Sequence, residues 1–454
     1  MARMIRNGET SSAELVKAHI EQIHKVNPAV NAVTELLSES ALKEAQTADA
    51  QRAKGEPGGP LHGVPVSIKD SIDIAGTRCT AGTLGRKDCE PAEHDATLVQ
   101  RLRSAGAIPL CKTNLPDLLF AYESDNLIYG RTNNPYDLQR TPGGSSGGES
   151  ALIAACGSPL GLGSDAAGSV RLPAHFCGIT SIKPTSGRLP RTGHVPPAGG
   201  WIAEVWQIGP MARYVEDVKL ALQILSGEDG LDFTSPPVPL DEPSELRGLR
   251  LAFFTHNGFA PCTPETEEAV RTAARRLADC GMHVEEKTPP GVADAYELEL
   301  ALLGADGGEG IDAYMQSVGS HEKHPLLEDG FLSRMRPHRA SMSQFAARWA
   351  QWDQYRAGMA RFFQDFDAVL SPVYTQPALQ HGESVKPGNF EGFSYTMAWN
   401  IAGTPAAVVR CAEQGGLPIN VQVTTKWWRD TLALEICQEL ERGFGGWKPP
   451  KLIR

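Results

Sequence analysis

Two segments rich in glycine and serine carry the side chains whose types and spacing could do nucleophilic chemistry. The first, Thr141-Pro-Gly-Gly-Ser-Ser-Gly-Gly-Glu-Ser150, runs directly into the apolar segment 151–156. A flexible linker is the ordinary interpretation of such a composition, but linkers join separate modules, and no change of composition marks one here. The segment therefore favours a site where the backbone is crowded around a reacting group.

The second segment, residues 160–173, predicts an apolar strand that ends in a tight turn and displays Ser169. A serine hydroxyl is a poor nucleophile until a base accepts its proton. The small residues Ala166, Ala167 and Gly168 just before it would let backbone N–H groups converge on a substrate oxygen, as an oxyanion hole requires. The turn thus indicates a nucleophilic serine with its oxyanion hole.

Upstream, residues 64–70 (VPVSIKD) predict a strand that ends beside a lysine. Because side chains alternate across a strand, Ser67 and Lys69 share the face opposite to the valines and the isoleucine. Lys69 would then point away from the apolar layer. A single lysine at a strand end is more often solvated than catalytic, so Lys69 alone does not identify a base.

Three stretches together resemble the amidase signature family. They are residues 59–70 (GPLHGVPVSIKD), residues 143–185 (GGSSGGESALIAACGSPLGLGSDAAGSVRLPAHFCGITSIKPT) and residues 416–422 (GLPINVQ). The central stretch is long enough to be highly specific, and the likeness runs from the first helix to the last. The resemblance therefore covers nearly the whole chain.

The resemblance implies a role for particular positions. The family's catalytic lysine falls on Lys69, its bridging serine on Ser145 and its acylated serine on Ser169, with oxyanion-hole amides in residues 166–169. The family's positions next to the scissile group fall on Leu119, Phe120, Ala121 and Tyr122. The chain departs from the family at Ala167, where many members have glycine. A positive φ there would strain its Cβ, but we expect the oxyanion geometry to survive.

In the family's mechanism the base is a neutral lysine, which is Lys69 here. None of the twelve histidines offers a compelling partner for the serines. His62, His94 and His175 lie near the motifs, and we expect structural or surface roles for them. A neutral lysine at pH 7 requires its pKa to fall by roughly 3 units, which burial can supply. The resemblance implies no metal and no organic cofactor.

The family fold is a single α/β domain, here residues 1–454, with a mixed central β-sheet covered by helices on both sides. We expect residues 255–365 to form a variable, mostly helical region that shapes the substrate pocket. Local patterns agree with α/β alternation. They predict helices over 11–26, 37–54, 96–105, 150–156 and 431–442 and strands over 64–70, 107–111, 367–372 and 417–424.

The bulk composition excludes several classes of protein. The net charge of −11 without a long Lys/Arg run argues against nucleic acid and anionic membranes as partners. The nine scattered cysteines without a CxxC pair predict reduced thiols. We find no apolar segment typical of a secretory signal peptide, and no apolar run of about 20 residues that could span a membrane. We therefore expect a cytoplasmic protein that acts on a small molecule, and we leave a homodimer open.

Other motifs offer different interpretations. Ser146 satisfies the G-x-S-x-G pattern, but a nucleophile elbow follows an apolar strand and residues 137–142 are polar. Residues 161–166 match a dinucleotide fingerprint without the acid that should follow about 20 residues later. The S-x-x-K pattern at residues 320–323 and the neighbouring histidines lack companion motifs for a penicillin-binding or metal site.

The predicted activity is hydrolysis of amide C–N bonds through an acyl-enzyme on Ser169. Carbamates (urethanes) and esters pass through a similar oxyanion and are further candidates. Tryptophans could make the pocket aromatic or apolar, among them Trp201, Trp206, Trp349, Trp352 and Trp399. The alternative is the glutamine-hydrolysing component of an aminoacyl-tRNA amidotransferase, its A chain, which resembles the same family. A scaffold without catalysis is disfavoured because all three catalytic positions are filled.

Overall fold

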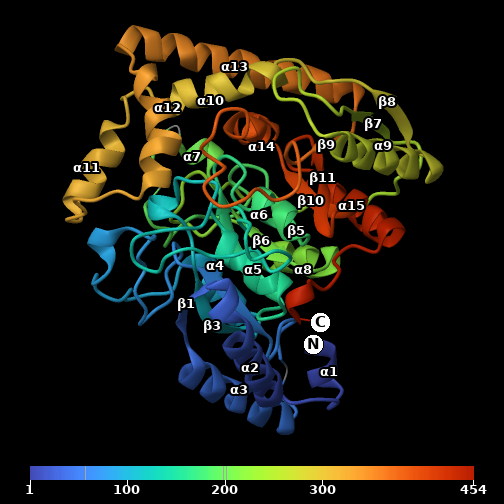
Figure 1. Ribbon diagram of the computed structural model, residues 1–454. Coiled ribbons are helices and arrows are strands. Elements are labelled where there is room, and N and C mark those ends of the chain that lie inside the picture. Colours follow the sequence, from blue (N-terminus) through green and yellow to red (C-terminus); the bar gives the residue numbers. More distant parts are fainter. Residues whose placement is uncertain (57, 198, 201, 454) are drawn as a thin grey trace.

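A mixed β-sheet forms the centre of the molecule (Figure 1). The computed structural model describes residues 1–454 except 57, 198, 201 and 454. Within these described residues the sheet has eleven strands in the order β1-β3-β2-β4-β6-β5-β10-β11-β9-β7-β8. The strands are β1 (Val33–Leu36), β2 (Pro65–Lys69), β3 (Ile108–Thr113), β4 (Leu160–Asp165), β5 (Thr180–Lys183), β6 (Gln207–Ala212), β7 (Arg250–Phe253), β8 (His283–Glu286), β9 (Ala368–Pro372), β10 (Ala406–Gln414) and β11 (Leu417–Thr425).

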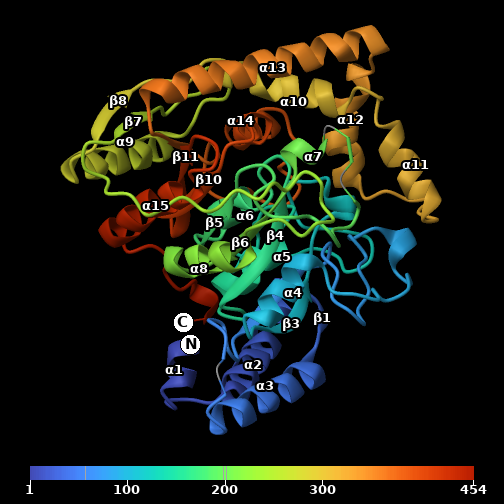
Figure 2. The same ribbon diagram turned by 180° about the vertical axis from the view of Figure 1, so that it is seen from behind.

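Helices surround this sheet. They are α1 (Ala2–Arg6), α2 (Ser12–Val30), α3 (Ser38–Ala53), α4 (Thr97–Ser104), α5 (Gly147–Ala154), α6 (Arg171–Phe176), α7 (Ile202–Val205), α8 (Val215–Leu225), α9 (Pro264–Asp279), α10 (Ala295–Leu303), α11 (Glu309–Ser317), α12 (Ser333–Met335), α13 (Met342–Asp365), α14 (Ser394–Ala402) and α15 (Asp430–Phe444). In both views α2 and α3 lie at one end of the molecule and α13 at the other, and the two termini lie close together (Figures 1 and 2).

Strand β2 pairs in parallel with β3 and β4, and β7 pairs in parallel with β8 and β9, while β10 and β11 are antiparallel. One apolar core lies between the sheet and helices α4, α8, α9 and α15, and it contains Val66 and Ile68 of β2. The neighbouring residues of β2 face α5 on the opposite side. The expected mixed α/β sheet with helices on both faces is therefore confirmed.

Helix α2 begins where the sequence predicts but ends later. Its start carries a capping box formed by Ser11 and Glu14. The predicted end at residue 26 is wrong, because the helix includes Pro28 and continues to Val30. The Asn27 side chain accepts the backbone N–H of Ala32 at 2.7 Å, beyond the helix end. Proline removes one helical hydrogen bond, which the packing of a buried helix can tolerate.

The region 255–365 is mostly helical, as expected, but it also contains the edge strand β8. The sequence of β8 is HVEE, and its side chains are largely exposed. A short, charged edge strand lacks the apolar alternation that predicts a strand, so the pattern could not reveal it.

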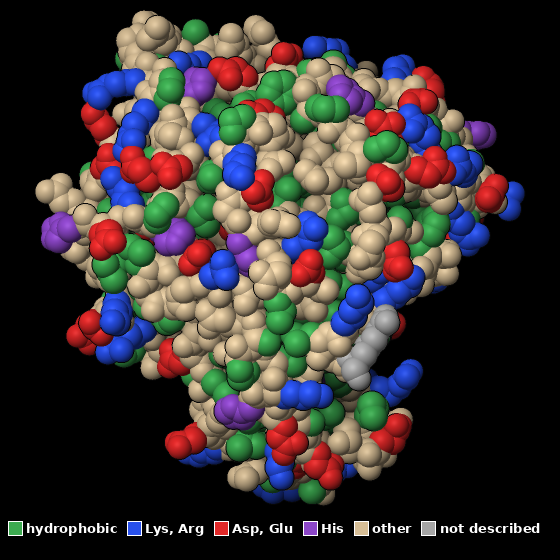
Figure 3. Space-filling model, in the orientation of Figure 1, with side chains coloured by type: hydrophobic (Ala, Val, Ile, Leu, Met, Phe, Trp, Pro, Cys, Tyr) green, Lys and Arg blue, Asp and Glu red, His purple; other side chains and the backbone are tan. Residues whose placement is uncertain are grey.

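The surface carries both signs of charge. Figure 3 shows acidic and basic side chains interspersed over the face that it draws, without one continuous basic area. Among the described residues, no helix combines the length and the apolar character needed to cross a membrane.

Candidate active site

Lys69 is the last residue of β2, and its side chain is completely buried. Its Nζ atom lies 2.6 Å from Ser145 Oγ and 2.9 Å from Ser146 Oγ. A third hydroxyl, that of Ser164 on β4, lies 3.2 Å away. The ordinary fate of a strand-end lysine, a solvated ammonium, does not apply to this one.

The buried position changes the acid–base behaviour of Lys69. Burial lowers the pKa of Lys69 well below its ordinary value, although the Asp165 and Glu149 carboxylates oppose this shift. Removing an ammonium from water disfavours its charged form, and hydroxyl groups compensate much less than a contacting carboxylate. The amine is therefore suited to accept a proton from the Ser145 hydroxyl.

Ser145 lies in the tight turn before α5. The Gly147 N–H donates to Ser124 Oγ at 3.0 Å and fixes the far side of this turn. A Cβ atom on Gly144 would lie 2.6 Å from the carbonyl oxygen of Ala121, so only glycine permits this approach. The glycines of the motif thus bring Ser145 to the end of the lysine side chain.

Ser169 lies in the turn between β4 and α6, and 9% of its surface is exposed. The N–H of Ser146 donates to the Ser169 carbonyl at 3.1 Å, so the two serine-bearing turns are joined. Ser145 and Ser169 line the same pocket. The structure thus places Lys69 in contact with Ser145, and Ser145 and Ser169 at one pocket.

The carboxylate of Asp165 shapes the turn that carries Ser169. It accepts the N–H of Gly168 at 2.7 Å and that of Val170 at 3.1 Å. It also accepts from the buried Arg171 guanidinium at 3.0 Å and from the Asn400 amide at 2.9 Å. Burial by itself raises the pKa of Asp165, but Arg171 outweighs it and holds this pKa well below its ordinary value.

The backbone strain that a positive φ at Ala167 would cause is absent from the turn that carries Ser169. Gly168 has a φ of 120°, and the Ala167 backbone does not enter positive φ. A Cβ on Gly168 would lie 2.3 Å from the Thr396 hydroxyl oxygen. Asp165 takes the Gly168 N–H, while the N–H groups of Ala167 and Ser169 have no partner in the described part of the chain. Backbone donors of this turn therefore remain for a substrate oxygen.

Comparison with known proteins shows the family of this chain. The family model for amidases matches residues 14–434. The chain belongs to the amidase signature family. It is 35% identical over 456 residues to an indoleacetamide hydrolase of Bradyrhizobium diazoefficiens, covering 98% of this chain and 86% of that protein.

Two further similarities bear on this amidase. It is 32% identical over 485 residues to the human (Homo sapiens) fatty-acid amide hydrolase 2, covering 99% of this chain and 89% of that one. The solved structure of 6-aminohexanoate cyclic dimer hydrolase complexed with substrate superposes with a TM-score of 0.88. That pair is 28% identical, and the match covers 100% of this chain and 98% of the other.

The amidase pocket is mainly apolar. It is lined by Leu119, Phe120, Ser145, Ser164, Ala166, Ala167, Ser169, Ile202, Trp206, Leu303 and Phe331. The Phe120 ring meets the Trp206 ring edge-on at 6.5 Å and the Phe331 ring at 5.8 Å between centroids. Three aromatic rings from distant parts of the chain therefore form one wall.

Two of the four residues that the resemblance placed next to the scissile group lie behind this wall. Ala121 and Tyr122 are buried and are not among the described lining residues. The Tyr122 hydroxyl donates to the Ala167 carbonyl at 3.1 Å, and its ring stacks on Phe393. Tyr122 therefore supports the oxyanion turn from outside the pocket, while Leu119 and Phe120 face it.

The other serine motifs do not reach the pocket. Ser146 is fully buried beside Lys69 and is not among the described lining residues. Lys323 of the S-x-x-K pattern forms an ion pair with Asp312 at 2.6 Å. In the part of the chain that the structure describes, no group of three or more His, Cys, Asp or Glu is arranged to hold a metal ion.

The tryptophans named from the sequence lie in different environments. Trp206 lines the pocket, whereas Trp352 and Trp399 are buried in a separate core cluster and Trp349 is 38% exposed. Trp201 lies outside the described residues. The tryptophan count in the sequence thus says little about the pocket.

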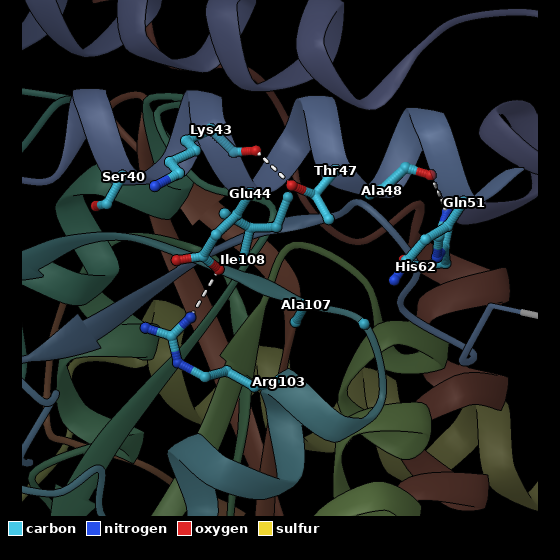
Figure 4. Close-up of a pocket in the computed structure, with 11 residues that line it drawn as sticks. Ser40, Lys43, Glu44, Thr47, Ala48, Gln51, His62, Arg103, Ala107 and Ile108 are labelled. Atoms are coloured by element: carbon cyan, nitrogen blue, oxygen red, sulfur yellow. Dashed lines mark hydrogen bonds and ion pairs between the residues drawn. The ribbon is translucent and has the colours of Figure 1, made fainter. Parts of the chain in front are cut away.

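A second pocket lies between α3 and the start of β3, and it shares no lining residue with the first (Figure 4). Its lining includes charged side chains, among them the ion pair between Arg103 and Glu44 at 2.6 Å. Figure 4 shows the α3 side chains along one side and Arg103 on the other. It has no serine–lysine pair in contact, so its chemistry does not match that of the first pocket.

Proposed function

We propose that this amidase hydrolyses the C–N bond of small or aryl amides, with Ser169 as nucleophile, Ser145 as proton bridge and Lys69 as base. One observation carries the proposal. The buried Lys69 amine lies 2.6 Å from Ser145 Oγ, and Ser145 shares an apolar pocket with Ser169. A lysine that loses its proton by burial supplies the base that the histidines do not.

Acylation follows from this order of groups. Neutral Lys69 accepts the proton of Ser145, Ser145 accepts the proton of Ser169, and Ser169 Oγ attacks the carbonyl carbon. The carbonyl oxygen becomes an oxyanion that the N–H groups of Ala167 and Ser169 are free to stabilise. The developing charge is thus met by donors that need no rearrangement.

The relay then runs in reverse. The proton on Lys69 returns through Ser145 to the nitrogen of the substrate, and the C–N bond breaks with a neutral amine as leaving group. An ester on Ser169 remains. Water attacks this ester after giving its proton to the same relay, and the acid leaves as Ser169 regains its hydroxyl. One lysine therefore acts as base and as acid in each half-reaction.

The pocket supports an uncharged substrate. Its walls include Phe120, Trp206 and Phe331, and none of its described lining residues is charged. Aromatic walls favour aryl or apolar groups through burial and edge-to-face contact. Aryl carbamates (urethanes) and esters share the carbonyl geometry and are included as secondary substrates. The residues from 255–365 contribute Leu303 and Phe331, in line with the substrate-shaping role proposed for that region.

The glutamine-hydrolysing alternative has less support from the pocket. Free glutamine carries an ammonium and a carboxylate, and burying them without partners is costly. The described lining residues offer hydroxyls, backbone and apolar side chains but no charge.

All nine cysteines are free, which supports the proposed cytoplasmic location.

A substrate panel tests this proposal. The purified chain is assayed with an acyl anilide, an arylacetamide, a phenyl carbamate and glutamine under identical conditions. We expect kcat/KM for at least one aryl amide to exceed that for glutamine by about 100-fold or more, because an unpaired buried charge weakens binding strongly. Release of ammonia from glutamine without aryl amide hydrolysis, especially after partner subunits are added, would overturn the proposal.

A further inference from the structure

A carboxylic acid that takes no part in the proposed reaction packs against β2, the strand that carries Lys69. Glu149 on α5 is fully buried. Its Oε2 accepts from the Thr113 hydroxyl of β3 at 2.6 Å, and its Oε1 accepts from the Ser67 hydroxyl of β2. Ser67 and Lys69 are two residues apart on one strand and so point to the same face. The carboxyl and the catalytic amine therefore share one side of the sheet.

The neighbouring strand leaves room for this carboxyl. A Cβ atom on Gly161 of β4 would lie 1.6 Å from Glu149 Oε1 and 2.7 Å from the Ser67 hydroxyl oxygen. No side chain could occupy that position while Glu149 is present. Strands β2 and β3 supply hydroxyl donors and β4 supplies the space, so the carboxyl is held in a site built from three strands.

The charged and titratable groups around the pair are few. Lys69 on β2 is the basic group that acts on Glu149, Asp165 at the end of β4 also acts on Lys69, and Cys111 on β3 lies near Glu149. His194 also senses the charge of Lys69, but burial keeps its own pKa low. Lys69 thus has two carboxylates near it, and only Asp165 has an arginine partner.

The two buried groups influence each other's ionisation. Burial raises the pKa of Glu149 to about 7, although hydrogen bonds from Ser67 and Thr113 and the charge of Lys69 act in the other direction. A charge in a buried, low-dielectric environment interacts strongly with a neighbouring ionisable group, and the two groups of such a pair titrate together. An ionised Glu149 favours the protonated lysine, whereas a neutral Glu149 favours the free amine that the mechanism needs.

We propose that Glu149 is a positioning residue for the base: its carboxylate, fixed by Ser67 and Thr113 on the face of the sheet that carries Lys69, sets the lower pH limit of catalysis. The inference rests on the proposed function, because it assumes that Lys69 acts as the base. Glu149 is not among the described lining residues of the pocket and acts through the lysine alone.

Replacing the charge has a definite sign. Glu149→Gln keeps the shape and removes the negative charge, so Lys69 gives up its proton more easily. The acidic limb of the pH profile should move to lower pH by about 1 unit, the size of coupling typical of interacting buried groups. Glu149→Asp keeps the charge and should leave the limb near its wild-type position even if the rate falls.

The experiment measures how fast a fluorophosphonate modifies Ser169 between about pH 5 and about pH 10, the range over which such bases titrate. In this reaction Ser169 Oγ bonds to phosphorus, fluoride leaves, and the serine proton passes to the relay. The readout needs no knowledge of the substrate. Glu299→Gln is the matched control, because Glu299 is also a buried carboxyl on α10 but interacts with Arg171 and Asp165 rather than with Lys69.

Each outcome decides the inference. A limb shifted in Glu149→Gln and unshifted in Glu299→Gln and Glu149→Asp supports it, and superimposable profiles overturn it. If Glu149→Gln does not fold, Ser67→Ala carries the test. Loss of that hydrogen bond makes Glu149 harder to ionise and should move the limb in the same direction by less. A wild type that is never modified at Ser169 contradicts the proposed function itself, which is a distinguishable result.

Discussion

The Asp165 carboxylate and the Arg171 guanidinium form a completely buried ion pair at 3.0 Å at the turn that carries Ser169. The same carboxylate fixes the N–H groups of Gly168 and Val170. The geometry of the oxyanion turn therefore depends on a charge pair that does not touch the substrate.

Asp165→Asn should impair both stability and catalysis. It leaves the Arg171 charge buried without its partner, which typically lowers the free energy of unfolding by roughly 3–5 kcal/mol. We expect kcat to fall by about 100-fold or more as the turn loosens. Asp232→Asn is the matched control, because Asp232 pairs with Arg191 at 3.1 Å away from the serines. An equal loss of kcat in both variants would contradict a specific role of Asp165.

Lys69→Arg should abolish acylation although it keeps a basic side chain. Arginine stays protonated at all working pH values and cannot accept the serine proton. We expect the rate of Ser169 modification to drop by about 1,000-fold or more. The control is Lys183→Met, since Lys183 is equally buried but its amine donates to the Pro184 carbonyl at 2.9 Å. Retained labelling in Lys69→Arg would contradict the assignment of the base.

Lys69→Met should make the protein inactive and more stable. Burial lowers the pKa of Lys69 in the folded chain, so the unfolded chain binds the extra proton and is favoured at neutral pH. Removing the amine should raise the free energy of unfolding by roughly 1–2 kcal/mol at pH 7. The gain should shrink as the pH approaches about 10.4, the ordinary lysine pKa. Urea unfolding at several pH values checks it, and a constant difference would refute it.

Three buried histidines predict acid destabilisation. Burial lowers the pKa of His19 and of His175 to about 4 and that of His194 to about 3. In the unfolded chain each titrates near its ordinary value of about 6.5. Stability should therefore be complete above about pH 6.5 and decline as the pH falls toward about 4. In His19→Gln the decline measured by urea unfolding should be shallower, and an unchanged slope would speak against it.

Leu303 separates the reaction pocket from an outer groove. It lines both, and the groove also contains Leu302, Met342 and Phe345. Leu303→Ala should join the two spaces and raise kcat/KM for long acyl anilides relative to short ones by about tenfold, a change typical of added apolar room. Leu302 lines the groove but not the reaction pocket, so Leu302→Ala should keep the wild-type ratio. A ratio unchanged in Leu303→Ala would show that the groove stays closed.

The sequence locates the side chains of the candidate site better than it predicts the pocket walls. Lys69, Ser145 and Ser169 lie in dense local motifs, because tight turns and close backbone contacts demand glycine and serine at fixed spacing. The alternation along β2 predicts the side on which Lys69 lies but not its burial, since α5 and β4 enclose it from elsewhere in the chain. Asp165 and Arg171, six residues apart within the same stretch, could have been suspected as a pair.

The pocket walls depend on contacts between distant segments. Ile202, Leu303 and Phe331 come from three separate parts of the chain, and no local pattern connects them. The end of α2 was missed for a related reason, because Pro28 is tolerated when the helix packs firmly on its neighbours. Tertiary packing, rather than local propensity, decides both features.

The most direct test of the account is the site of covalent modification. The purified chain is treated with a fluorophosphonate, weighed intact by mass spectrometry and mapped by peptides, with Ser169→Ala and Ser145→Ala in parallel. The account predicts a single adduct on Ser169, no adduct in Ser169→Ala and strongly slowed labelling in Ser145→Ala. An adduct on Ser146, or undiminished labelling in Ser169→Ala, would contradict it.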